Sequence, residues 1–224
     1  MEDIIIYIIV SIVSFCLGSI PFAYFFGKIA LKEDLRTSGS KNTGALNTLR
    51  ASNRKYGSVI GVLSFLCVFL LDAGKAVLAA YIATGLIENS VIAITIATFF
   101  AVLGHNYSPI LNFKGGRGAA SFFGVILFYN PKAFVGYLIV LLSCMFIGEI
   151  FAGRPISKKF FKRAASEQIV GRLIGEIIGV FYIGLAAPQL FWAALITTPL
   201  IIIAHTSRIK DQLKKIKNKT YLND

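Results

Sequence analysis

Long runs of apolar residues, separated by short polar stretches, dominate the pattern of this chain. A helix needs about 20 apolar residues to cross about 30 Å of hydrocarbon. Seven segments reach or approach that length, at residues 4–26, 57–86, 89–107, 117–130, 133–153, 169–186 and 188–205. The fourth is short, and the second is long enough to be tilted or broken. The pattern predicts an all-α integral membrane protein with about seven transmembrane helices, forming one domain over residues 1–224.

The composition agrees with this class of protein. The chain is 56% hydrophobic with a mean hydropathy of +0.72, above the roughly half-apolar composition of soluble domains. The apolar residues fall in continuous runs, without the alternation or helical spacing that would leave a face for water. A water-soluble fold is therefore excluded.

The net charge of +12 raises the question of a nucleic-acid partner, because basic proteins often bind phosphate backbones. The distribution of the charge gives a different answer. Of the 23 Lys and Arg residues, 21 lie in or beside four polar stretches, at 27–56, 108–116, 154–168 and 206–224. Cations beside membrane helices face the cytoplasm. We therefore expect no nucleic-acid partner. We expect a multi-pass protein of the plasma membrane, with its N-terminus outside the cell and its C-terminus in the cytoplasm.

The first polar stretch contains RTSGSKNTGALNTLR at residues 36–50. Gly39 and Gly44 permit close backbone approach, while hydroxyl, amide and cationic side chains nearby offer hydrogen-bond donors to an anion. This composition predicts a phosphate cradle. The alternative is an ordinary turn-rich loop.

A second candidate is KGGRG at residues 114–118, which enters the next apolar segment. Unpaired N–H groups and the helix dipole favour an anion at a helix N-terminus, and Lys114 and Arg117 add whole charges. Glycines alone are weak evidence, because they also serve helix packing in membranes.

Other polar residues interrupt the apolar segments. Asp72 and Lys75 are three residues apart and lie on one predicted helix face. They are either part of a functional site or a structural pair whose charges neutralise each other. Pro21 marks a break in the first segment. His105 and His205 stand at segment ends beside the polar loops, where an interfacial histidine is either solvated or a ligand contact. Neither begins an H-x4-D acyltransferase motif, and we predict neither a metal nor a cofactor.

Four stretches in this order, GSIPFAYFFGK, GSKNTGALNTLR, LLDAGK and GHNYSPILNFKGGRG, resemble the acyl-phosphate:glycerol-3-phosphate acyltransferase (PlsY) family over residues 18 to about 121. The first-loop pattern G-S-x-N-x-G-A-T-N-x-x-R is met except at Leu46, where threonine is usual. In the second loop Arg117 replaces the usual lysine and Pro109 stands one place late. The family's third motif, H-R-x-N-I-x-R-L, is poorly kept in HTSRIKDQL, where Arg208 replaces asparagine.

The resemblance implies transfer of an acyl group from acyl phosphate to the sn-1 hydroxyl of glycerol 3-phosphate, or of another polyol phosphate, with membrane lipids around the site. Lysophosphatidic acid and phosphate would be the products. It implies that the substrate's own phosphate accepts the hydroxyl proton. Because the distribution of Lys and Arg places every strong motif on the cytoplasmic side, we expect the active site to face the cytoplasm. The acyl chain would lie between helices, and His105 and His205 at the rim of the site. The implied catalytic residues are Ser40, Asn42, Arg50 and Lys114. The implied substrate-binding residues are Gly39, Gly44, Asn47, His105, Gly115, Gly116, Arg117, Gly118 and His205.

Two alternatives from other classes stay open. A transporter for a small phosphorylated anion also uses broken helices and cationic loops, although every strong motif here is predicted on one side of the membrane. A non-catalytic binding homologue would fit the loss of the third motif. The basic stretch 154–168 is either an interfacial helix on anionic headgroups or a lid over the site.

Overall fold

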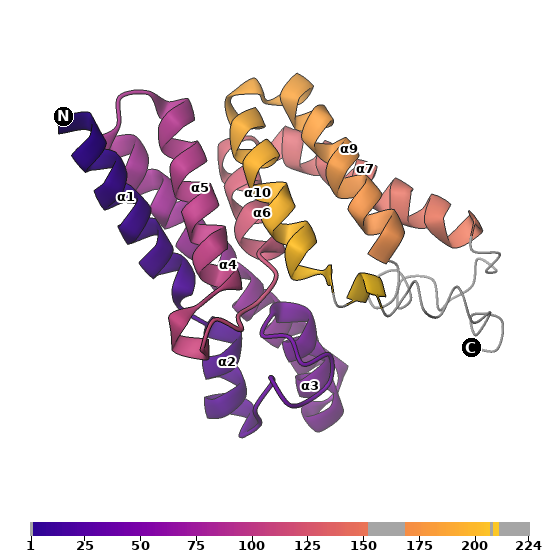
Figure 1. The fold of residues 1–224 in the computed structure, drawn as a ribbon. Helices are drawn as coiled ribbons and strands as arrows, with labels where there is room; N and C mark the ends of the chain where they lie inside the picture. Colours follow the sequence, from indigo (N-terminus) through magenta and orange to yellow (C-terminus); the bar gives the residue numbers. More distant parts are fainter. Residues whose placement is uncertain (1, 152–168, 207, 211–224) are drawn as a thin grey trace.

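The computed structural model describes residues 2–151, 169–206 and 208–210, and the regular structure in these ranges is helical (Figure 1). The α-helices are α1 Glu2–Ser19, α2 Phe22–Phe26, α3 Ala45–Tyr56, α4 Ser58–Leu86, α5 Ser90–Asn106, α6 Ala119–Tyr129, α7 Pro131–Phe151, α9 Ile169–Ala186 and α10 Phe191–Ala204. A π-helical turn, η1, covers Gly27–Leu31, and 3-10 turns cover Pro109–Leu111 (η2) and Pro188–Leu190 (η3). The predicted all-α fold is confirmed in these ranges. The basic stretch 154–168 lies outside the described residues.

Helix length separates the predicted membrane segments into two groups. The stretches long and apolar enough to cross a membrane are Glu2–Leu31, Ser58–Leu86, Ser90–Leu111, Pro131–Phe151 and Ile169–Ala186. The remaining two predicted segments correspond to shorter apolar stretches, Ala119–Tyr129 and Pro188–Ala204. At 1.5 Å per residue, α6 is only about 16 Å long and does not cover the hydrocarbon by itself. The long second segment is a single unbroken helix, α4.

The outer surface of the bundle carries large apolar side chains. Val59, Leu70 and Tyr81 on α4 are 71%, 62% and 66% exposed. Water would penalise such a surface, whereas lipid tails solvate it. The helices satisfy their own backbone hydrogen bonds, as the hydrocarbon region requires. The apolar runs in the sequence are thereby explained, because one side of each helix faces lipid and the other side packs against neighbouring helices.

Small residues allow α1 and α5 to approach each other closely. A Cβ at Gly18 would overlap the carbonyl oxygen of Ala101, and one at Gly104 would overlap that of Phe15. Without a hydrophobic force between helices in lipid, close backbone approach and dispersion contacts stabilise such pairs. The two glycines therefore hold the end of α5, where His105 lies, against α1.

The first membrane segment breaks where the sequence predicts. Pro21 separates α1 from α2, and the carbonyls freed there find partners on other elements. Lys75 Nζ donates to the Ile20 carbonyl at 2.7 Å, and Ser108 Oγ donates to the Ser19 carbonyl at 2.6 Å. The break thus joins α1, α4 and the loop after α5 at one end of the molecule.

The predicted polar loop 27–56 contains more helix than the hydropathy pattern indicates. The first membrane helix continues through α2 and η1 to Leu31, and α3 then packs against the start of α4. In Figure 1, α2 and α3 lie below the bundle, at the end toward which α5 and α10 run. The N-terminus and the turns that contain residues 87–89 and 187–190 lie at the opposite end. Motifs that are distant in sequence therefore meet at one end.

Candidate active site

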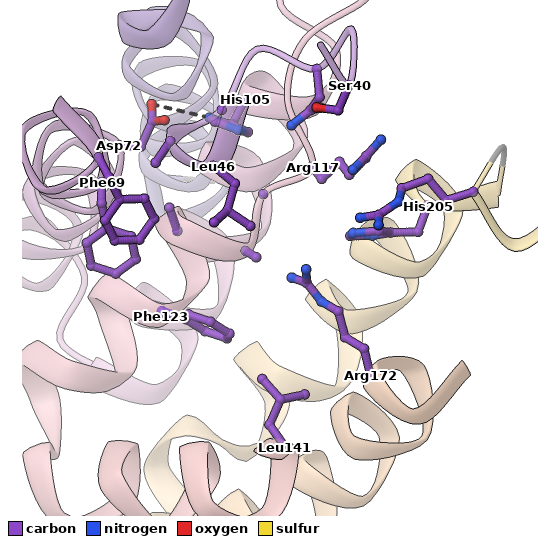
Figure 2. A pocket seen from close by; sticks show the side chains of 18 of the residues that line it. Ser40, Leu46, Phe69, Asp72, His105, Arg117, Phe123, Leu141, Arg172 and His205 are labelled. Carbon is purple, nitrogen blue, oxygen red and sulfur yellow. Dashed lines mark ion pairs between the residues drawn. The ribbon is translucent and has the colours of Figure 1, made fainter. Parts of the chain in front are cut away.

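A cavity of about 270 Å³ lies where α3, α4, α5, α6, α7, α9 and the segment after α10 come together (Figure 2). Residues from both predicted loops and from the C-terminal region line it. The predicted site residues that line it are Ser40, Asn42, Gly44, Arg50, His105, Arg117, Gly118 and His205. The structure thus brings together side chains up to 168 positions apart in the chain, from Ser40 to Arg208.

Asn47 is one of the predicted site residues that does not line the cavity, because the loop itself uses its amide. Its Nδ2 donates to the carbonyls of Leu35 and Ser38, and its Oδ1 accepts from the Ser40 N–H at 2.9 Å. The side chain is buried. Asn47 therefore fixes the backbone that presents Ser40 to the cavity, and Gly39 lies beside it without reaching the lining.

The glycine stretch after α5 is also held by the protein. The Gly115 N–H donates to the Asn106 carbonyl at 3.0 Å, and the Gly116 N–H donates to the His105 carbonyl at 2.9 Å. These two N–H groups are therefore occupied, and neither residue lines the cavity; Lys114 is exposed and lies outside the lining.

The start of α6 forms part of the cavity wall. Gly118 precedes the helix with φ of +79°, a conformation that suits glycine, and Ala119 and Ala120 line the cavity with it. The first N–H groups of a helix have no intrahelical partner, and the helix dipole adds partial positive charge there. The helix N-terminus thus suits an anion, and the residues of this stretch that line the cavity are Arg117 to Ala120 and not Gly115 and Gly116.

A buried polar cluster closes the inner end of the cavity. Asp72 Oδ1 lies 2.9 Å from Lys75 Nζ and 3.5 Å from His105 Nδ1. The predicted pairing of Asp72 with Lys75 is therefore confirmed. Asp72 and His105 both line the cavity, and the Asp72 carbonyl accepts from Ser121 Oγ of α6 at 2.9 Å. The cluster joins α4, α5 and α6.

Both histidines are buried, which differs from the expected position at the rim. His105 is 6% exposed and His205 1%. His105 is enclosed because Gly116 packs directly on its ring: a Cβ at Gly116 would overlap Nε2. His205 ends α10, and its Nδ1 lies 2.8 Å from the Ile201 carbonyl. They face the cavity from its walls.

Four arginines from four different segments converge on the cavity. Arg50 comes from α3, Arg117 from the loop before α6, Arg172 from α9, and Arg208 from the segment after α10. Burial lowers the pKa of Arg117 to about 10, and the charges of the other three add to the shift, yet the group stays protonated near neutral pH. Among the described residues, no carboxylate lies within ion-pair distance of Arg50 or Arg117. Such a wall fits phosphate.

The sequence analysis missed Arg172 and the contribution of Arg208. Arg172 has a recognisable signal, because it lies in an apolar segment with Glu176 four residues later. Arg208 stands where the family's third motif has asparagine, and the structure places it in the cavity wall despite this change. No group of three or more His, Cys, Asp or Glu residues with metal-binding geometry occurs in the described part of the chain.

The opposite wall of the cavity is apolar. It is formed by aromatic side chains of α4 and α6 and by three residues of α7, namely Phe65, Phe69, Phe123, Leu141, Leu142 and Met145. Leu142 is 50% exposed on the outer surface, so this wall reaches the lipid-facing side of the bundle. A cationic wall and an apolar wall in one cavity suit a molecule with a charged head and a hydrocarbon chain.

Fold and site together define a multi-pass integral membrane protein whose cavity has one cationic wall and one apolar wall. A family model described as glycerol-3-phosphate acyltransferase matches residues 8–215. The chain belongs to this family, and the resemblance found in the sequence is confirmed over nearly its whole length.

Individual curated relatives carry the same family description. The glycerol-3-phosphate acyltransferase of Staphylococcus haemolyticus is 30% identical, over 94% of this chain and 98% of that protein. That of Bartonella henselae is 41% identical, over 57% of this chain and 58% of the relative. The chain therefore spans less than two thirds of the length of some curated relatives that it matches.

A solved structure shows the same fold. PlsY (YgiH), an integral membrane glycerol 3-phosphate acyltransferase, superposes in its glycerol 3-phosphate form with a TM-score of 0.69 and 26% identity, over 93% of this chain and 92% of that one. Its lysophosphatidic acid form gives a TM-score of 0.66. The integral membrane, multi-pass class predicted from the sequence is thereby confirmed.

Proposed function

We propose that this chain transfers a fatty acyl group from acyl phosphate to the sn-1 hydroxyl of glycerol 3-phosphate, and releases lysophosphatidic acid and phosphate. The observation that carries the proposal is the cavity in which four arginines face an apolar wall that reaches the lipid surface. Membership of the glycerol-3-phosphate acyltransferase family supports it.

The reaction requires positive charge to bind the phosphates and alignment of the two substrates, more than a side chain that acts as nucleophile or base. Acyl phosphate is already a reactive mixed anhydride. The acceptor hydroxyl oxygen forms a bond to the acyl carbon, the bond from that carbon to the phosphate oxygen breaks, and phosphate leaves with the electron pair. The hydroxyl proton passes to a phosphate oxygen. Arginines and helix N–H groups that neutralise phosphate and hold the reactants together accelerate this chemistry.

The roles of individual residues follow from their place in the cavity. Ser40 and Asn42 line the cavity from the loop before α3 and Arg50 lines it from α3, and these three residues would hold the glycerol phosphate. Arg117 and the N–H groups at the start of α6 would hold the phosphate of the acyl donor. Lys114, exposed beside the same loop, would attract the substrates rather than contact the reacting atoms.

The rates of product formation with two acyl donors, acyl phosphate and acyl-CoA, test this proposal. Purified protein should form product with acyl phosphate and glycerol 3-phosphate, and much more slowly with acyl-CoA. The reason is that neither His105 nor His205 begins an H-x4-D motif that would activate the acceptor for attack on a thioester. Equal rates with the two donors at matched chain length would contradict the assignment of acyl phosphate.

We further propose that the cavity opens toward the cytoplasm of the plasma membrane, with the N-terminus outside. The distribution of Lys and Arg supports this orientation. In a variant without Cys16, Cys67 and Cys144, Glu88→Cys in the exposed α4–α5 turn should react with an impermeant maleimide in intact cells. Thr37→Cys, exposed at the other end, should react only after permeabilisation. Labelling of Thr37→Cys in intact cells would reverse the orientation.

A further inference from the structure

An ion pair lies inside the apolar helix α9. Arg172 Nε donates to Glu176 Oε1 at 3.0 Å, with side chains that are 16% and 1% exposed. Two charges in a membrane helix are costly even when paired. Their presence at adjacent turns of α9 therefore requires an explanation.

The pair faces the cavity on one side only. Arg172 belongs to the cavity lining, whereas Glu176 lies behind it and does not. Glu176 engages Nε, which leaves the two terminal guanidinium nitrogens of Arg172 available for another partner. Figure 2 shows this guanidinium directed from α9 toward the side of the cavity that holds Arg117 and His205. Glu176 thus fixes the direction of a cation whose outer edge points into the cavity.

Arg172 stands where the cationic wall meets the apolar wall. The residues on either side of it on α9, Gly171 and Gly175, pack closely against α7: a Cβ at Gly171 would lie 2.9 Å from Met145 Cα, and one at Gly175 would lie 3.0 Å from Leu141 Cα. Both α7 residues belong to the apolar wall. A phosphate that contacts Arg172 is therefore next to the place where a hydrocarbon chain would begin.

The charges around the cavity favour the same assignment. The guanidinium groups of Arg50, Arg117, Arg172 and Arg208 face one cavity, and although Glu176 already balances Arg172, a phosphate placed among the four groups would be attracted by each of them. Glycerol 3-phosphate and acyl phosphate each bring a phosphate, and Arg50 lines the cavity from α3, the helix that follows the loop of Ser40 and Asn42. Of these two substrates, only the acyl donor carries both a phosphate and a hydrocarbon chain.

We propose that Arg172 binds the phosphate of the acyl donor through its terminal guanidinium nitrogens, and that Glu176 is a positioning residue that holds this guanidinium toward the cavity. The inference rests on the proposed acyl transfer and adds a residue to its donor site. A guanidinium fork can contact two phosphate oxygens at once, which a lysine ammonium cannot reproduce.

Steady-state kinetics of purified variants, with each substrate varied in turn, test the proposal. Arg172→Gln should raise the KM for acyl phosphate about 10- to 100-fold, the range expected for loss of a hydrogen bond to a charged group. The KM for glycerol 3-phosphate should stay within about twofold, and Arg172→Lys should recover part of the loss. Glu176→Gln should raise the donor KM by a smaller factor, because the amide oxygen still accepts from Nε while the charge is lost.

A double variant separates binding from folding. Arg172→Gln leaves the Glu176 carboxylate unpaired in the membrane and can prevent folding, whereas Arg172→Met with Glu176→Leu replaces the whole pair by apolar side chains, a change that buried pairs often tolerate. The double variant should fold with near wild-type yield and still show the raised donor KM. Arg54→Gln, which removes the exposed pair of Arg54 with Glu33, serves as the control with unchanged kinetics.

The outcomes are distinct. A folded double variant with wild-type KM for both substrates would show a purely structural pair and overturn the proposal. A raised KM for glycerol 3-phosphate alone would overturn the donor assignment. If the wild-type protein itself transfers no acyl group, the proposed function fails rather than this inference.

Discussion

Replacing Gly116 with leucine is expected to reduce kcat/KM for acyl transfer at least 100-fold, about 2.7 kcal/mol of transition-state stabilisation. A Cβ at this buried position would overlap His105 Nε2, and the His105 ring is held on its other side by Asp72 at 3.5 Å. The ring can yield only if the Asp72 cluster opens or the loop moves away from α5. Either movement shifts Arg117 and the start of α6, which face the proposed donor phosphate. Turnover of the purified variant gives the measurement.

The control for Gly116→Leu is a leucine at a glycine with open surroundings. A Cβ at Gly85 meets nothing within 4 Å, so Gly85→Leu should retain wild-type turnover. If Gly116→Leu does not accumulate in the membrane, Gly116→Ala introduces the same Cβ with less bulk and should fold with reduced activity. Near wild-type turnover of a folded Gly116→Leu variant would show that the approach of the loop to His105 has no role in catalysis.

Replacing Arg50 with alanine is expected to raise the KM for glycerol 3-phosphate about 10- to 100-fold and to leave the KM for acyl phosphate nearly unchanged. Arg50 lines the cavity from α3, and Ser40 and Asn42 line it from the loop before α3; among the described residues, no carboxylate forms an ion pair with Arg50. Arg50→Lys should recover only part of the loss, because an ammonium replaces the planar fork only as a point charge.

The KM values of the two Arg50 variants show whether Arg50 contacts the substrate or only sets the orientation of the protein in the membrane. Membrane insertion reads charge and not hydrogen-bond geometry, so lysine would substitute fully if Arg50 only oriented the protein. Arg54→Gln, one turn further along α3 with its partner Glu33 at 3.1 Å, provides the matched control. Full activity of Arg50→Lys together with near-full activity of Arg50→Ala would remove Arg50 from the site.

The helical segments and the family could be predicted from the sequence because both depend on local patterns. Apolar runs of sufficient length specify membrane helices. Pro21 interrupts the helix after α1 whatever the tertiary contacts are, because proline lacks the backbone N–H. The motif residues around Ser40 and Arg117 are also local, and the structure places several of them in one cavity.

The direction of single side chains and N–H groups could not be predicted in the same way. Gly115 and Gly116 donate to carbonyls of α5 because the chain turns back on that helix, a tertiary contact with no local signal. Whether Arg172 faces lipid, the loops or the cavity depends on the rotation of α9. That rotation is set by the close approach of Gly171 and Gly175 to α7. A count of cations near segment ends records the charge of Arg172 but not its direction.

The most direct test of the proposed function is product formation by the purified full-length protein with long-chain acyl phosphate and radiolabelled glycerol 3-phosphate. We expect labelled lysophosphatidic acid and inorganic phosphate to appear in equal amounts, at a rate that is proportional to the enzyme concentration and greatly reduced in Gly116→Leu. Release of phosphate without labelled lysophosphatidic acid, or no turnover by a folded wild-type protein, would contradict the proposed function.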